Sequence, residues 1–234
     1  IMLSDAYRRD SRFADARNLQ VDPDNRLLWR MNRRRLEAET LWDSIHAAAG
    51  TLNLQLGGRP VMPPLADDEI ASLRDRWHWP VSADPADHNR RGMYIVVRRN
   101  FRFPMFEVFD SPVNAVSCPA REVTTVAPQA LWLLNNAAMF RQAQELAARL
   151  VRESKDDSPA QIDRAFAITL SRPPTAKERQ EAARLIQTLT SAARPAAEPA
   201  KPQAAPAKSS GHSSEALAKF CLALFNLNEF AFID

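Results

Sequence analysis

The C-terminal half of the chain constrains the fold most, because its apolar residues recur at helical spacing from Pro128 onward. This pattern predicts helices over residues 128–135 and 136–153. Ser158 is predicted to cap a further helix, which opens with Pro159 and ends before Pro173. The chain holds 17 prolines and only 5 glycines, which favours helices ended by proline over a sandwich of glycine-rich turns. The sequence therefore predicts a mainly α fold.

The last predicted helix has to fold back onto the others across a long spacer. Thr175 and Glu178 form a capping box for a helix over 176–193. Residues 194–211, rich in alanine, proline and lysine, are then expected to be an extended, mobile spacer within the domain. Beyond the spacer, one helix face carries Leu217, Phe220, Cys221, Leu224 and Phe225. Because such a face needs cover, we expect this helix to pack on the earlier helices, so that residues 1–234 form one multi-helical domain.

The N-terminal part is predicted to be less regular. Residues 1–22 are polar, and Asp22 followed by proline is typical of a helix start. A second helix is expected to run from a cap at Asn32 to Gly50. One face of that helix gathers Ala38, Leu41, Trp42, Ile45, Ala48 and Ala49. This face predicts a helix buried on one side.

Long irregular loops are expected between these helical parts. Residues 50–69 are rich in turn-forming glycine and proline. Residues 70–92 are expected to form a short helix followed by a polar excursion. The segment 93–103, MYIVVRRNFRF, is either a short buried strand or a packed helical turn, because periodicity does not separate the two.

Five arginines crowd into residues 26–35, around Trp29. Arginine beside tryptophan can stack on bases and contact phosphate. However, residues 33–43 combine three arginines with Glu37, Glu39 and Asp43, so their formal charges cancel. A phosphate-binding stripe usually keeps its charge uncompensated. We therefore expect no nucleic-acid partner, and the block is either an internal ion network or a site for an anion or carboxylate.

Helical spacing favours the internal network. In a helix that starts at Asn32, Arg34 and Arg35 share the face of Ala38, whereas Arg33 points to solvent. Buried arginines need partners, because an unpaired buried charge is costly. We therefore expect Arg34 and Arg35 to be largely buried and paired.

The carboxylates of the same segment supply the expected partners. Glu39 is four residues from Arg35, and Glu39 and Asp43 repel one another unless an outside arginine joins them. Arg121 is the candidate for that outside arginine. The network would then tie the helix to the 110–125 loop, with Glu39 largely buried.

That loop concentrates polar side chains in front of a predicted helix. They are Asp110, Cys118, Arg121, Thr124, Thr125 and Gln129. Such a loop can bind an anionic or sugar-like ligand, although each residue also has a local use in a turn or cap. The candidate polar cluster therefore comprises Arg34, Arg35, Glu39, Asp43, Asp110 and Arg121. Cys118 and Cys221 are predicted to be free thiols.

Several kinds of site are not expected in this chain. No stretch reaches the eighteen apolar residues of a transmembrane segment. The two cysteines form no CxxC or CxxCH motif and the four histidines have no ligand spacing, so neither a metal nor a cofactor is predicted. The opening IMLSDAYRRDSRF is typical of the middle of an element. We therefore expect the chain to be the C-terminal part of a longer protein.

Four blocks in order resemble one family. They are DPDNRLLWRMNRRRLEAETLWDSI, FEVFDSPVNAVSCPAREVTTVAPQALWLLN, AFAITLSRPPTAKE and LFNLNEFAFID. The chain is thereby similar to the planctomycete secreted domain family. The resemblance implies an exported protein, periplasmic or in the cell envelope. It also implies upstream domains of the same polypeptide as partners, among them a cytochrome-c-like domain that would carry a haem. It implies no activity and no catalytic residue.

Two functions from different classes follow as hypotheses. The first is a non-catalytic scaffold or interaction domain of such a protein. The alternative is an enzyme module that acts on an extracellular substrate such as a polysaccharide, through Asp110, Arg121 and the arginine helix. An enzyme requires a concave pocket where these groups converge, whereas a scaffold predicts that they are paired and closed to solvent. The sequence names no small-molecule or glycan ligand.

Overall fold

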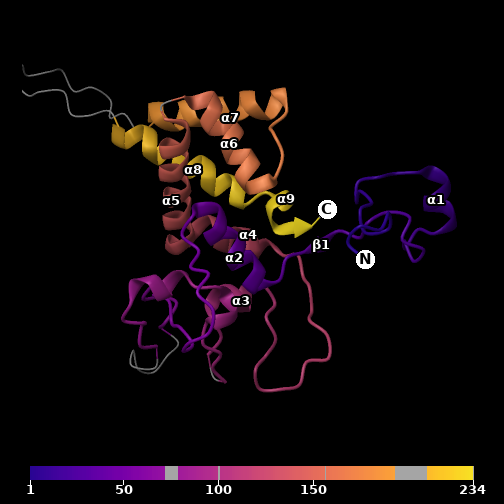
Figure 1. Cartoon of the computed structure of the whole chain (residues 1–234), viewed down its shortest axis with the longest axis horizontal. Coiled ribbons are helices and arrows are strands. Elements are labelled where there is room, and N and C mark those ends of the chain that lie inside the picture. The colour runs from indigo at the N-terminus through magenta and orange to yellow at the C-terminus, as the bar shows by residue number, and fades with distance from the viewer. Residues whose placement is uncertain (72–78, 100, 156, 193–209, 234) are drawn as a thin grey trace, which may run out of the picture.

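The protein is described here by a computed structural model of residues 1–71, 79–99, 101–155, 157–192 and 210–233. The described chain is mainly α-helical, as the sequence predicted (Figure 1). Its α-helices are α1 (Ala16–Val21), α2 (Ala38–Ala49), α3 (Pro104–Val108), α4 (Ala127–Asn135), α5 (Ala137–Ser154), α6 (Ser158–Leu170), α7 (Ala176–Ala192), α8 (Ser210–Phe225) and α9 (Asn228–Ala231). Two strands, β1 (Arg34–Arg35) and β2 (Phe232–Ile233), pair antiparallel.

Helix α5 runs along one side of the helical body in Figure 1 and packs on most of the other long helices. It contacts α2, α4, α6 and α8, and it starts where the Asn136 side chain accepts hydrogen bonds from the backbone N–H groups of Ala138 and Met139. Its buried residues are Met139, Ala143, Leu146, Ala147 and Leu150. Their spacing at three and four residues keeps one apolar face against the core.

The prediction for the C-terminal helix is confirmed. Helix α8 lies against α5 and α7, and both Phe220 and Leu224 are 3% exposed. Cys221 is also buried, and burial raises the pKa of its thiol. Both Cys118 and Cys221 are free, as expected. Of the predicted spacer over 194–211, residues up to 209 lie outside the described residues, and the rest belong to α8.

The predicted capping box of α7 is also present. The Thr175 N–H donates to the Glu178 carboxylate at 2.7 Å, and the Glu178 N–H donates to the Thr175 hydroxyl at 3.3 Å. Arg172 donates to Glu178 and to Glu229 of α9, and its hydrogen bonds lower the pKa of Glu178 to about 2. This ion cluster fastens α7 to α9. The cap of α6 is Asp157 rather than the predicted Ser158.

The predicted helix start at Asp22 is wrong. Asp22 follows α1 instead, and its carboxylate accepts hydrogen bonds from the backbone N–H groups of Arg26 at 2.9 Å and Leu27 at 2.7 Å. Aspartate competes for nearby backbone donors in this way and thereby favours a turn over a continuing helix.

The predicted helix start at Asn32 is wrong as well. Helix α2 begins only at Ala38, and the Asn32 side chain accepts a hydrogen bond from Asn25. Between them, Arg34 and Arg35 form β1 opposite Phe232 and Ile233. Strand β1 pairs with a strand about 200 residues away in sequence. The spacing of residues around Arg34 therefore does not predict this strand.

The loop-rich middle of the chain packs beneath α2 and α3 (Figure 1). Short 3-10 turns lie at Pro85–Asn89 and Gly92–Tyr94, and Val61 bridges to Ile95. The segment 93–103 thus combines part of a turn with isolated bridges, and within it Ile95 and Phe103 are buried. The helix expected after residue 70 falls largely on residues 72–78, outside the described residues. No helix among the described residues has the length and apolarity needed to cross a bilayer.

A buried histidine packs into the core beside Trp42. His46 is 2% exposed, and its ring centroid lies 4.2 Å from that of Trp42. Its Nδ1 lies 3.0 Å from the Thr51 hydroxyl, which donates to Gln142 at 2.8 Å. Its Nε2 is buried without a hydrogen-bond partner among the described residues. Burial therefore lowers the pKa of His46 to about 3.

We expect this histidine to make the fold sensitive to acid. Below pH 6.5 the unfolded chain binds a proton at His46, whereas the folded protein stays neutral there until about pH 3. As the pH is lowered from 6.5 to about 3, the free energy of unfolding should therefore fall by up to about 1.4 kcal/mol per pH unit. Urea denaturation across this range should show a shallower fall for His46→Gln. The control His88→Gln, outside the core, should keep the slope of the parent protein; equal slopes for parent and His46→Gln would contradict the assignment.

Candidate functional site: the Arg35–Asp110 cluster

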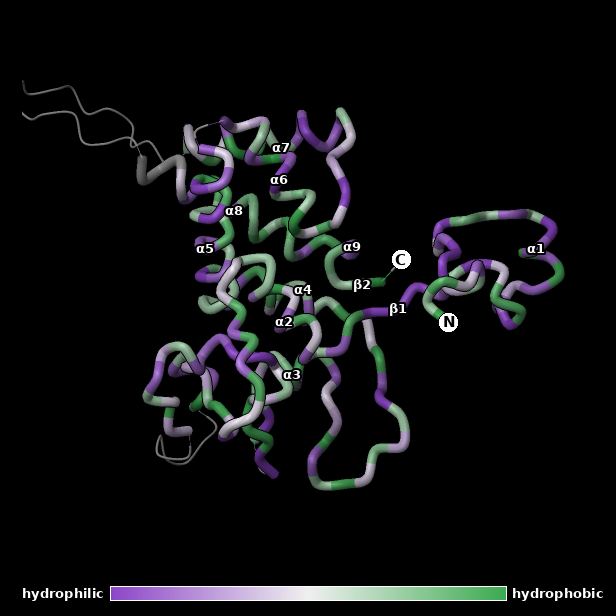
Figure 2. Tube along the Cα trace, viewed as in Figure 1, coloured by the Kyte–Doolittle hydropathy of each residue, from purple (hydrophilic) through white to green (hydrophobic). Residues whose placement is uncertain are grey.

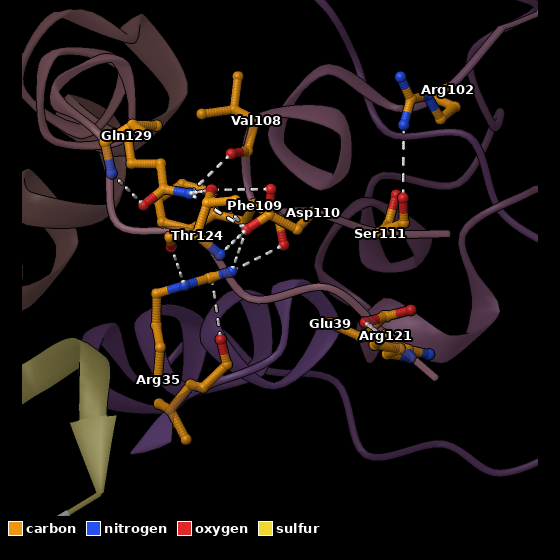
Figure 3. Close-up of polar contacts among 12 residues, drawn as sticks. Arg35, Glu39, Arg102, Val108, Phe109, Asp110, Ser111, Arg121, Thr124 and Gln129 are labelled. Carbon is orange, nitrogen blue, oxygen red and sulfur yellow. Dashed lines mark hydrogen bonds and ion pairs between the residues drawn. The ribbon is translucent and has the colours of Figure 1, made fainter. Parts of the chain in front are cut away.

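Arg35 is the buried centre of the candidate cluster (Figure 3). Neighbouring residues on a strand point to opposite faces, so β1 directs Arg35 inward, where it is 4% exposed. Its guanidinium donates to the Asp110 carboxylate at 2.7 Å and to the carbonyl oxygens of Thr124 at 3.1 Å, Leu36 at 3.1 Å and Phe109 at 3.3 Å. Each of the three nitrogens of the Arg35 guanidinium therefore donates at least one hydrogen bond.

Asp110 is equally well satisfied. Its carboxylate accepts from Arg35, from the Thr124 N–H at 2.8 Å and from the Thr124 hydroxyl at 2.9 Å. Gln129, buried in the first turn of α4, donates to it at 3.4 Å and to the Val108 carbonyl at 3.1 Å. The cluster thus joins β1, the end of α3, the 110–125 loop and the start of α4. A buried charge pair is stable only with such extra hydrogen bonds.

Arg121 forms a second pair nearer to solvent. It donates to the Glu39 carboxylate at 2.7 Å, and Glu37 lies 3.4 Å from the same nitrogen. The hydrogen bond to Glu39 raises the pKa of Arg121 above its ordinary value. The predicted contact between Arg121 and Glu39 is therefore present, although Glu39 is half-buried rather than largely buried.

Asp43 does not join the cluster. It accepts from the Arg91 side chain at 2.9 Å and from the Gly92 N–H at 2.6 Å. A Cβ at position 92 would meet the Glu39 backbone at 2.9 Å, so glycine allows this close approach. Asp43 lies one helical turn after Glu39 on the same face of α2, but it pairs with Arg91 and Gly92 instead of Arg121. Neither Arg91 nor Gly92 was predicted from the sequence.

Arg34 is exposed, contrary to prediction. Strand alternation turns its side chain outward, where it is 68% exposed and lies 3.6 Å from Glu37. Arg33 is exposed, as expected. The helical spacing placed both Arg34 and Arg35 on the buried face, but a strand buries alternate residues.

A pocket of about 360 Å³ lies against this cluster. Its charged lining residues are Arg34, Arg35, Arg121, Glu37, Asp110 and Glu122. The three arginines and three carboxylates balance, so the pocket has no formal excess of either charge. Among the residues that the structure describes, no three His, Cys, Asp or Glu side chains converge as metal ligands.

Comparison with known proteins identifies the family. The model of the PSD1 family, described as proteins of unknown function (DUF1553), matches residues 1–186. The chain belongs to the PSD1 family. The match includes the whole Arg35–Asp110 cluster, and α8, α9 and β2 lie beyond its end. No curated protein and no solved structure matches the chain.

The cluster predicts unequal roles for two adjacent arginines of this PSD1 domain. Arg35→Ala should lower the free energy of unfolding by about 3–5 kcal/mol, because it leaves Asp110 charged without its partner. Arg34→Ala removes an exposed side chain and should cost about 0–1 kcal/mol. Urea denaturation of both variants measures the difference. Equally mild effects would show that Arg35 does not hold the fold together.

Proposed function

We propose that this PSD1 domain is a non-catalytic interaction domain. The observation that carries the proposal is that Arg35 and Asp110 pair with one another inside the protein. Arg35 and Asp110 satisfy one another and the surrounding backbone, with side chains only 3% and 18% exposed. Each nitrogen of the Arg35 guanidinium already donates within the protein, so these groups hold segments of the chain together.

The half-buried carboxylates beside the cluster support the same proposal. Glu37 and Glu39 both lie within ion-pair distance of Arg121. These two glutamates therefore hold the 110–125 loop on α2 through the Arg121 guanidinium.

A second candidate function is an enzyme module that acts on an extracellular substrate such as a polysaccharide. The pocket of about 360 Å³ beside Arg34 and Arg121 favours it. Such a volume lies within the range of small-molecule sites. The exposed arginines would favour a saccharide that carries carboxylates.

Assays on purified protein separate the two functions. The chain is incubated with neutral and uronic-acid-containing polysaccharides, and the release of reducing ends is measured. We expect no release above the background of Asp110→Asn, and a saturable complex with another protein in calorimetry. Release that is lost in Arg121→Ala and kept in Arg91→Ala would replace the interaction function by the enzyme function. Arg91 is the matched control because it pairs with Asp43 outside the pocket.

We also propose that the domain works in the cell envelope, in a polypeptide that carries a cytochrome-c-like haem domain. The support is the resemblance of four sequence blocks to the planctomycete secreted domain family. Cell fractionation with an antibody against this domain, followed by haem staining of the same band, tests the placement. A cytoplasmic band without haem would contradict it.

A further inference from the structure

Residues 1–34, here called the N-terminal arm, are organised differently from the helical body (Figure 1). No side chain of the arm belongs to the hydrophobic core of the described residues. The buried side chains of the arm are polar: Ser11, Asp22 and Asn25. Hydrogen-bonded polar groups therefore fill the interior of the arm, whereas apolar side chains fill the interior of the body.

Asp22 and Asn25 hold the arm in shape. Asp22 accepts from two backbone N–H groups, and its carbonyl accepts from the Trp29 indole at 2.9 Å. Asn25 accepts from the Arg30 N–H at 3.1 Å and donates to the Arg30 carbonyl at 2.7 Å. Net hydrogen-bond contributions are only about 0.5–1.5 kcal/mol each, while ordering each residue costs about 1–2 kcal/mol. These hydrogen bonds define the conformation of the arm, but they contribute less free energy than the ordering of its residues costs. The arm therefore requires the burial of further apolar side chains.

The apolar side chains of the arm face outward. Those that are exposed include Leu3, Phe13, Val21, Leu27 and Leu28. Leu27 is 76% exposed and Val21 is 72% exposed. Figure 2 shows hydrophobic stretches along the arm, beyond the helical body. Several exposed apolar side chains within one short segment offer apolar surface to a partner.

The arm also carries the net charge of the chain. Residues 1–34 hold eight arginines and five aspartates. Their formal net charge of +3 equals that of the whole chain, so residues 35–234 are neutral overall. A surface that is complementary to the arm is therefore acidic as well as apolar.

We propose that the N-terminal arm docks onto an acidic, partly apolar face of another folded protein domain. This inference rests on the proposed interaction function and names its surface and the class of partner. Docking buries the outward leucines and valine, and the arginines meet carboxylates of the partner. The match of the family model begins at residue 1, so the arm is part of the PSD1 domain.

The structure favours a protein over other anionic partners. Aspartates interrupt the arginines, and Arg12 lies 3.5 Å from Asp10, whereas phosphate-binding surfaces keep their charge uncompensated. Membrane-surface segments usually form a long helix with one apolar face, but α1 spans only six residues. The aliphatic side chains instead suit a shaped protein surface.

The experiment uses the full chain and two pairs of matched variants. Leu27→Ser with Leu28→Ser removes apolar surface from the arm, and Leu54→Ser with Leu56→Ser removes similarly exposed leucines from the body. Arg17→Ser with Arg26→Ser lowers the charge of the arm. Its control, Arg152→Ser with Arg184→Ser, takes two exposed arginines from the helices. Circular dichroism checks that each variant is folded.

Proteins retained by the immobilised chain from an extract of the source cells are identified by mass spectrometry, purified and titrated by calorimetry. We expect affinity to weaken by at least about tenfold in each arm variant, the loss of more than 1 kcal/mol typical of interface side chains. Both controls should bind like the parent chain. Added salt should weaken binding less in the variant that lacks Arg17 and Arg26, and hydrogen exchange should slow in residues 1–34.

Other results would overturn the proposal in distinguishable ways. A complex that the Leu54 and Leu56 control weakens and the arm variants do not would move the interface to the body and keep the interaction function. Arm-dependent self-association in sedimentation, or arm-dependent binding to phosphatidylglycerol vesicles, would replace the acidic protein by another partner. Retention of no protein, together with release of reducing ends from polysaccharide, would remove both proposals.

Discussion

The burial of one guanidinium, that of Arg35, is the constraint on which the rest of the cluster depends. An arginine keeps its charge at any ordinary pH, so burying it requires an anion and enough acceptors around it. Asp110 supplies the anion, and three backbone carbonyls supply the other acceptors. Because these acceptors come from the residue after β1, from the end of α3 and from the 110–125 loop, satisfying one side chain aligns three segments. Gln129 then extends the network to α4.

The helical body and the N-terminal arm are stabilised by different interactions. The helical body buries apolar faces of α2, α5, α6 and α8 in one core, and its ion clusters at Arg35 and Arg172 fasten loops and short elements onto that core. The N-terminal arm buries Asp22 and Asn25 and exposes its leucines. The helical body buries its apolar faces within itself, whereas the arm leaves apolar side chains exposed. For this reason we expect a partner to cover the arm.

Contacts between segments could be predicted from the sequence only in part. The pairing of Arg121 with Glu39 followed from two carboxylates one helical turn apart, which needed an outside cation. Bonding of Arg35 either within its own segment or to the 110–125 loop was predicted, and helical spacing favoured Glu39 as its partner; the structure shows Asp110 of the loop. Asp43 was expected in the same network, but Arg91 and the absent side chain of Gly92 offer it a closer site. Each of these outcomes depends on distances between residues that are far apart in sequence.

The sequence by itself determined helices α4 to α8, the burial of Phe220 and Leu224, and the capping box at Thr175, because apolar spacing and caps act within a few residues. It also showed that Asp110, Thr124 and Gln129 belong to one polar block in front of a helix. Only the tertiary structure decided the conformation of Arg34 and Arg35. The partner strand Phe232–Ile233 lies at the other end of the chain, and its pairing imposes a period of two residues on a segment whose sequence suggested a period of 3.6. That change of period buries Arg35 and exposes Arg34.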